Sequence, residues 1–190
     1  MSEVIKFNTE ELVTKPVQIE KPKTFALVSE NDPILREIMP DFDFTNPPVN
    51  PNEFASTMVE TCKQHHGIGL SANQCGFKYR MFVMGAENNY VAFFNPSIVL
   101  KSHKEVHMME GCLSFPFLGL RITRPEEIAV TYQDFNGEWK EATFAGISAR
   151  CFQHELDHMN GIVYTDKVKP LALQQGVKKR NKVLKKIGLK

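Results

Sequence analysis

The sequence predicts an α+β fold, in which short antiparallel and mixed sheets pack around one central helix. Three observations support this prediction. Short runs of β-branched and aromatic residues recur between residues 79 and 144, as is typical of antiparallel strands. Helical periodicity is confined to a few separate segments. The chain has 190 residues, which is enough for one domain with a substantial core.

The first elements lie ahead of the strands. Residues 1–24 are polar and are expected to form an N-terminal extension before a single domain over 25–190. Four prolines within 40–51 indicate a loop. Pro51 favours the first position of a helix, which we expect to end with Gly67 at its C′ position. The apolar face of this helix repeats at i+4 spacing and consists of Phe54, Met58 and Cys62.

Five short strands and two helices follow. The strands are expected at 79–84, 90–94, 98–100, 128–133 and 138–144. The Asn136-Gly137 turn favours a hairpin between the last two strands. Ser148 can cap the next helix, which Gly161 ends. Pro170 opens a final helix over 170–187.

The second helix carries a metal-binding pattern, His154-Glu155-Leu156-Asp157-His158. Residues four apart on a helix share one face, so the two imidazoles can bind the same ion. Glu155 adjoins a ligand without being one, and it can take a proton from water that the metal activates. This pattern predicts metal-assisted hydrolysis and places the metal on a buried central helix.

A third ligand is needed, and the sequence offers two candidates. Cys112 lies upstream in Glu-Gly-Cys-Leu-Ser, and a thiolate with two imidazoles leaves one coordination position open for water. Asp166 is the only anionic side chain after His158 and would suit a conventional zinc endopeptidase that uses both histidines. A closed structural zinc site and a non-catalytic metal-binding or ribosome-associated protein are the remaining alternatives.

The segment over 67–74 reads Gly-Ile-Gly-Leu-Ser-Ala-Asn-Gln. Together with Glu-Gly-Cys-Leu-Ser and Gln-His-Glu-Leu-Asp-His, in this order, it resembles the three motifs of the peptide deformylases, over about residues 25–165. The resemblance implies a peptide deformylase-like fold. It also implies a metal-dependent hydrolase that removes the formyl group from the N-terminal formylmethionine of newly made polypeptides and releases formate.

The resemblance also assigns roles to residues. It makes Cys112, His154 and His158 the ligands of one divalent metal, most often iron(II), with zinc, nickel or cobalt as substitutes. It implies that Glu155 is the general base and that the side-chain amide of Gln74 and the backbone N–H of Leu113 stabilise the oxyanion. Ser71 departs from the usual alanine of the first motif. The substrate-binding residues would be Ile68, Gly69, Glu110, Ile147, Arg150 and Cys151, with Glu110 paired to Arg124.

Composition limits the partners and the location. The 23 basic and 22 acidic side chains give no overall field for DNA, and no apolar run is long enough for a membrane span. Four cysteines without an export signal indicate reduced thiols and a bacterial-type cytoplasm, where a phage-encoded copy would look no different. Seven basic residues over 178–190 suggest ribosome contact through the final helix.

Overall fold

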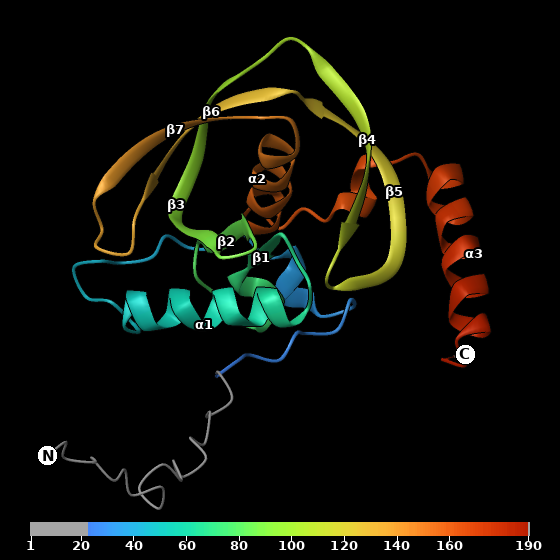
Figure 1. Ribbon diagram of the computed structural model, residues 1–190, viewed down its shortest axis with the longest axis horizontal. Helices are drawn as coiled ribbons and strands as arrows, with labels where there is room; N and C mark the ends of the chain where they lie inside the picture. Colours follow the sequence, from blue (N-terminus) through green and yellow to red (C-terminus); the bar gives the residue numbers. More distant parts are fainter. Residues whose placement is uncertain (1–22, 190) are drawn as a thin grey trace, which may run out of the picture.

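The computed structural model describes residues 23–189, so the expected extension over 1–24 lies almost wholly outside the described residues. The predicted α+β class is confirmed (Figure 1). Five strands form an antiparallel sheet in the order β1-β2-β3-β6-β7, and β4 pairs with β5 in a separate hairpin. The strands are β1 Gly69–Ser71, β2 Met81–Ala86, β3 Asn89–Lys101, β4 Glu105–Cys112, β5 Phe115–Pro125, β6 Glu127–Gln133 and β7 Trp139–Ala145.

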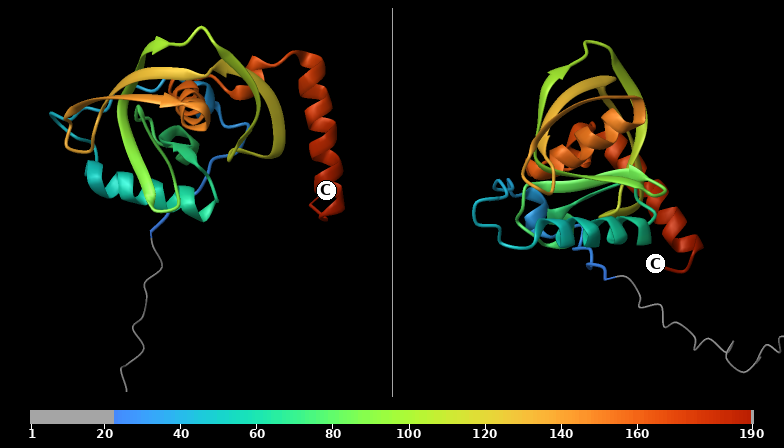
Figure 2. Two further views of the ribbon diagram at one scale, coloured as in Figure 1. Left: turned by 45° about the horizontal axis from the view of Figure 1, so that its top comes forward. Right: turned by 60° about the vertical axis from the view of Figure 1, so that its left-hand side comes forward.

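Three α-helices pack on these sheets: α1 Pro51–Gln64, α2 Gly146–Met159 and α3 Pro170–Lys186. In the right-hand view of Figure 2, the green strands β2 and β3 separate α2 from α1. Side chains of β2 alternate accordingly, because successive residues of a strand face opposite sides. Phe82 packs toward α2, whereas Val83 packs toward α1. The sheet therefore divides the interior into two apolar clusters.

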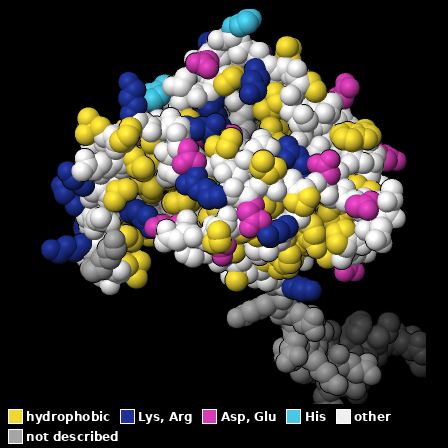
Figure 3. Space-filling model, turned by 180° about the vertical axis from the view of Figure 1, so that it is seen from behind, with side chains coloured by type: hydrophobic (Ala, Val, Ile, Leu, Met, Phe, Trp, Pro, Cys, Tyr) yellow, Lys and Arg dark blue, Asp and Glu magenta, His cyan; other side chains and the backbone are white. Residues whose placement is uncertain are grey.

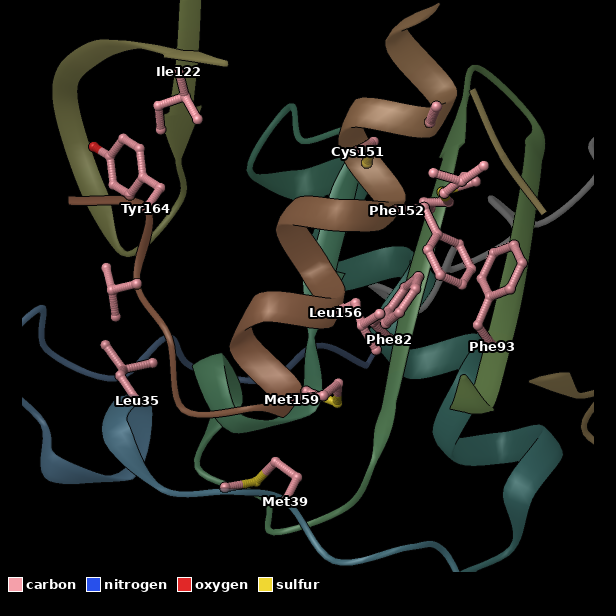
Figure 4. Packing of buried hydrophobic residues seen from close by; sticks show 14 of the residues in the cluster. Leu35, Met39, Phe82, Phe93, Ile122, Cys151, Phe152, Leu156, Met159 and Tyr164 are labelled. Carbon is pink, nitrogen blue, oxygen red and sulfur yellow. The ribbon is translucent and has the colours of Figure 1, made fainter. Parts of the chain in front are cut away.

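The cluster around α2 contains three packed phenylalanines, one from α2 and two from the sheet. Phe82, Phe93 and Phe152 meet with ring centroids 5.0 to 5.4 Å apart (Figure 4). α2 is buried along most of its length because the five-stranded sheet and the β4–β5 hairpin cover different sides of it. On the far side of the hairpin, α3 packs so closely that a Cβ on Gly176 would lie 2.7 Å from Leu120 Cδ2.

Several element boundaries differ from the sequence prediction. α1 ends at Gln64, and the left-handed residue after it is His66, with φ of 55°, instead of Gly67. α2 begins at Gly146, so Ser148 lies inside the helix and does not cap it. The two strands expected over 90–100 are one strand, β3, whose register shifts around Pro96.

The expected strands do not include the short strand β1 or the β4–β5 hairpin. The signal of the hairpin is present in β5, where Leu118, Leu120 and Ile122 alternate with exposed residues. Exposure in β4 also alternates, but the inner face carries the charged Glu110 and the outer face the apolar Met109, so the apolar pattern of the sequence is interrupted. No helix among residues 23–189 has the length and hydropathy needed to cross a lipid bilayer.

Candidate metal centre

Cys112, His154 and His158 come together at one point inside the molecule. Their ligand atoms all lie within 4.8 Å of one another, and Cys112 Sγ is 3.3 Å from His158 Nε2. Two ligands at tetrahedral positions around one zinc-sized ion would lie roughly 3.3–3.7 Å apart. The donor set therefore fits a single divalent ion. Among the described residues, this is the one group of histidine, cysteine and carboxylate side chains with such spacing.

Two local features place these ligands. The histidines occupy positions i and i+4 on α2, and their ring centroids are 5.1 Å apart. Cys112 ends β4, where it pairs with Phe115 across the turn into β5. Burial lowers the pKa of His158 well below its ordinary value, which favours the neutral imidazole that a metal requires.

Glu110 orients His154 from behind. Its Oε2 lies 3.1 Å from Nδ1 of His154, which leaves Nε2 of that ring for the metal. Burial alone would raise the pKa of Glu110, but hydrogen bonds from Arg124 and His154 hold it far below its ordinary range. Arg124 donates to both carboxylate oxygens, at 2.7 and 2.9 Å, so the predicted Glu110–Arg124 pair is present.

The same network continues to α2 and to the hairpin. Arg124 also donates to Asp157 (2.7 Å), and Arg150 donates to Glu110 (2.5 Å). These two carboxylates and two guanidinium groups balance each other, while Lys167 approaches Asp157 from the surface, where water screens its charge. Outside this network, Cys112 and Glu155 are the groups beside the two histidines that could contribute negative charge toward a bound cation. The charge inventory therefore also fits a bound cation.

Glu155 is buried beside the ligands, with 4% of its surface exposed. Burial raises its pKa, which His154 and a hydrogen bond from Ser71 act to lower. A Cβ at Gly69 would lie 2.5 Å from Oε1 of Glu155, so only glycine allows β1 to pass this carboxylate so closely. The glycine of the first motif and the glutamate of the third are thus parts of one contact.

Gln74 turns its amino group toward the same point. Its Oε1 accepts a hydrogen bond from the backbone N–H of Ser71 (2.9 Å). Its Nε2 therefore faces Cys112 Sγ and Ser114 Oγ, at 3.3 and 3.0 Å. Ser71 and Ser114 were not among the predicted site residues. The Ser-x-x-Gln spacing over 71–74 is the sequence signal for the Ser71–Gln74 contact, since it is typical of a capping box.

A cavity of about 710 Å³ opens onto this centre. All six predicted substrate-binding residues line it, as do Gln74, Leu113, His154 and Glu155. The guanidinium group of Arg150 points into the hairpin, where it bonds Glu110 and the carbonyls of Val106 and Ile122. The prediction missed the apolar wall contributed by the hairpin: Met109, Phe115, Pro116, Phe117 and Leu118.

Comparison with known proteins identifies the family. The family model described as polypeptide deformylase matches residues 25–174 of the chain. The chain belongs to the peptide deformylase family. A peptide deformylase from Thermotoga petrophila is 39% identical over 140 residues, covering 73% of this chain and 84% of its own length. One from Rhizobium meliloti is 32% identical and covers 84% of this chain and 93% of its own length.

Solved structures of peptide deformylases share the fold. The enzyme from Synechococcus elongatus in complex with actinonin has a TM-score of 0.78 at 31% identity, covering 86% of this chain and 88% of its own. A Met-Ala-Ser-bound enzyme from Acinetobacter baumannii has a TM-score of 0.73 at 28% identity, covering 78% of this chain and 100% of its own. The chain is accordingly a metal-dependent hydrolase that removes the formyl group from the N-terminal formylmethionine of newly made polypeptides.

The alternative with Asp166 as a metal ligand is wrong for this deformylase. Asp166 forms an ion pair with Arg36 and accepts a hydrogen bond from the backbone N–H of Val163 (3.1 Å). It is 44% exposed, whereas His154 and His158 are buried. Among the described residues, Cys112 and not Asp166 lies in the group formed with the two histidines.

Proposed function

We propose that Cys112, His154 and His158 hold one divalent metal, natively iron(II), and that Glu155 is the general base of deformylation. The observation that carries this proposal is the position of Glu155, which adjoins a ligand on α2 and meets the backbone of β1 at Gly69. A soft thiolate with two imidazoles suits iron(II) and zinc. When bound, the metal would act as a Lewis acid toward the formyl oxygen and would acidify water.

Substrate binding along β1 is supported by the register of the sheet. Gly85 donates its backbone N–H to Ile68 O (2.9 Å), and Gly69 lies opposite Met84. Gly69 is therefore in a non-hydrogen-bonded pair, with its N–H and C=O directed away from β2. Since β1 is the edge strand of the sheet, an extended peptide can pair with Gly69 by strand addition.

The methionine side chain would enter the cavity beside this strand. Ile68, Ile147 and Cys151 offer apolar surface there, and Ile68 and Ile147 are 49% and 55% exposed. The charged wall residues Glu110 and Arg150 are paired with each other, so they do not attract a charged side chain. The Met-Ala-Ser-bound relative from Acinetobacter baumannii supports a methionyl peptide as the product class.

The proposed proton path uses one carboxylate. Glu155 takes a proton from the attacking water and later delivers it to the amino group that leaves as the C–N bond breaks. The Gln74 side-chain amide and the Leu113 backbone N–H donate to the oxyanion that forms on the formyl carbon. Gln74 suits this role because its amino group already faces Cys112 (3.3 Å) and its oxygen is bound elsewhere.

Ribosome contact through α3 is a further part of the proposal, with the bacterial-type cytoplasm as the place of action. α3 has no acidic residue, and its lysines are exposed on the side opposite the β5 contact. They form a blue margin along the left-hand edge of Figure 3, where α3 lies in that view. The exposed lysines are Lys178, Lys179, Lys182, Lys185 and Lys186. Arg180 is instead held by Glu30 (2.6 Å).

Formate release from a formyl-Met-Ala-Ser peptide tests the chemistry, with enzyme purified anaerobically with iron(II). We expect turnover in the native chain and none in Glu155→Ala at unchanged metal content. Retained turnover in Glu155→Ala would exclude Glu155 as the base. Deleting residues 178–190 should weaken ribosome binding in a salt-dependent manner, and equal binding by the shortened chain would exclude the role of α3.

A further inference from the structure

Ser71 contacts two of the proposed catalytic groups at once, although it is not a metal ligand. It is fully buried at the end of β1. Its hydroxyl donates to Oε2 of Glu155 (2.7 Å), a residue 84 positions later in the chain. Its backbone N–H donates to Oε1 of Gln74 (2.9 Å). One residue of the first motif thus contacts both the base and an oxyanion donor.

The hydroxyl makes the two oxygens of Glu155 unequal. Oε2 accepts from Ser71, whereas Oε1 lies next to Gly69, whose ideal Cβ would be 2.5 Å from it. Gly69 lines the cavity, so Oε1 is the oxygen on the substrate side. The terminal torsion of a glutamate is broad, with two nearly equivalent orientations of the carboxylate. A hydrogen bond to one ionised oxygen removes that equivalence.

We propose that Ser71 is a positioning residue for deformylation. Its hydroxyl holds Oε2 of Glu155 so that Oε1 is the oxygen that exchanges the proton with water and with the leaving amine. Its backbone N–H holds the oxygen of Gln74, which leaves the amino group of that side chain directed at the oxyanion. This inference rests on the proposed function of Glu155 and Gln74, and it adds a third group that aligns both of them from β1.

The substitution Ser71→Ala separates these two contacts, because it removes the hydroxyl and keeps the backbone N–H. We expect kcat for formyl-Met-Ala-Ser to fall about tenfold, a part of what a general base contributes. KM should stay within twofold, since β1 still presents Gly69 to the peptide. Bound metal should remain one ion per chain, because Ser71 contacts none of the three ligands through its side chain.

Two further variants distinguish alignment from stability. Ser71→Thr retains the hydroxyl and should retain at least half of the native kcat. Thr61→Val removes a hydroxyl that is equally buried but bonds only Thr57 O and Phe25 N, far along the chain from Glu155. It should lower Tm and leave kcat unchanged.

Three results would overturn the inference. The first is native kcat in Ser71→Ala, and the second is a loss of kcat in Ser71→Ala that only follows a loss of bound metal or of folded protein. The third is a folded Ser71→Thr that is as slow as Ser71→Ala. Failure of the proposed function gives a different pattern. Full turnover in Glu155→Ala removes the role of the base itself, whereas loss in Glu155→Ala with native turnover in Ser71→Ala removes only the role of Ser71.

Discussion

The two sides of the five-stranded sheet are built differently. The side that packs on α1 is apolar, with rings such as Phe42, Phe54 and Phe94 around Met58. The side that packs on α2 combines apolar packing with buried charges, among them Glu110, Arg124 and Glu155. Burying an ionic group is costly unless every charge is paired. The α2 side therefore serves the reaction, and the α1 side supplies stability without that cost.

The largest expected effect comes from breaking the buried ionic network. Arg124→Met leaves Glu110 and Asp157 without their shared partner, which is expected to lower the free energy of unfolding by about 3–5 kcal/mol. His154 also loses its support through Glu110, so bound metal should fall as well. Chemical denaturation and metal analysis measure the two effects.

Arg36→Met is the matched control for Arg124→Met. Arg36 pairs with Asp166 at the surface, where its side chain is 50% exposed, and such pairs contribute about 1 kcal/mol or less. Its metal content should equal that of the native chain. Equal destabilisation by the two arginine substitutions would show that the buried ionic network contributes no more to stability than a surface ion pair.

A large substitution on the α1 side should affect stability alone. Met58 is fully buried there, so Met58→Ala is expected to lower the free energy of unfolding by about 2–4 kcal/mol through the cavity it leaves. Bound metal and kcat/KM at 25 °C should stay native, because Met58 packs in the cluster on the α1 side and not in the cluster around α2. Met58→Leu keeps the volume and should cost under about 1.5 kcal/mol. Loss of metal in folded Met58→Ala would show that the sheet does not separate the two sides.

The smallest expected effect is a difference in the reactivity of the cysteine thiols, which compares Cys112 at the metal centre with the cysteines buried elsewhere. Burial raises the pKa of Cys62 and of Cys75 to about 12, so both stay protonated and unreactive at pH 8. Burial also raises the pKa of Cys151 well above its ordinary value. Iodoacetamide should therefore label Cys112 first after chelation of the metal. Mass spectrometry of the folded chain measures this, and labelling of Cys62 at a similar rate would contradict it.

The sequence by itself predicted the paired histidines of the candidate metal centre, the α+β class and the hairpin around Asn136-Gly137. These features depend on local rules: the i+4 spacing of His154 and His158 on a helix, and the backbone preference of an Asn-Gly turn. The three motifs extended this to the family, because each motif keeps its residues within a few positions of one another.

Only the tertiary structure decided how the motifs meet. The contact of Ser71 with Glu155 joins residues 84 positions apart in the sequence, and Arg150 donates to the carbonyl of Val106, which lies 44 positions earlier. The β4–β5 hairpin likewise depends on tertiary contacts, because Met109 on the outer face and Glu110 on the inner face of β4 interrupt its apolar alternation. Such contacts are fixed by which surfaces bury each other and by which buried polar groups need partners, and local sequence does not contain either property.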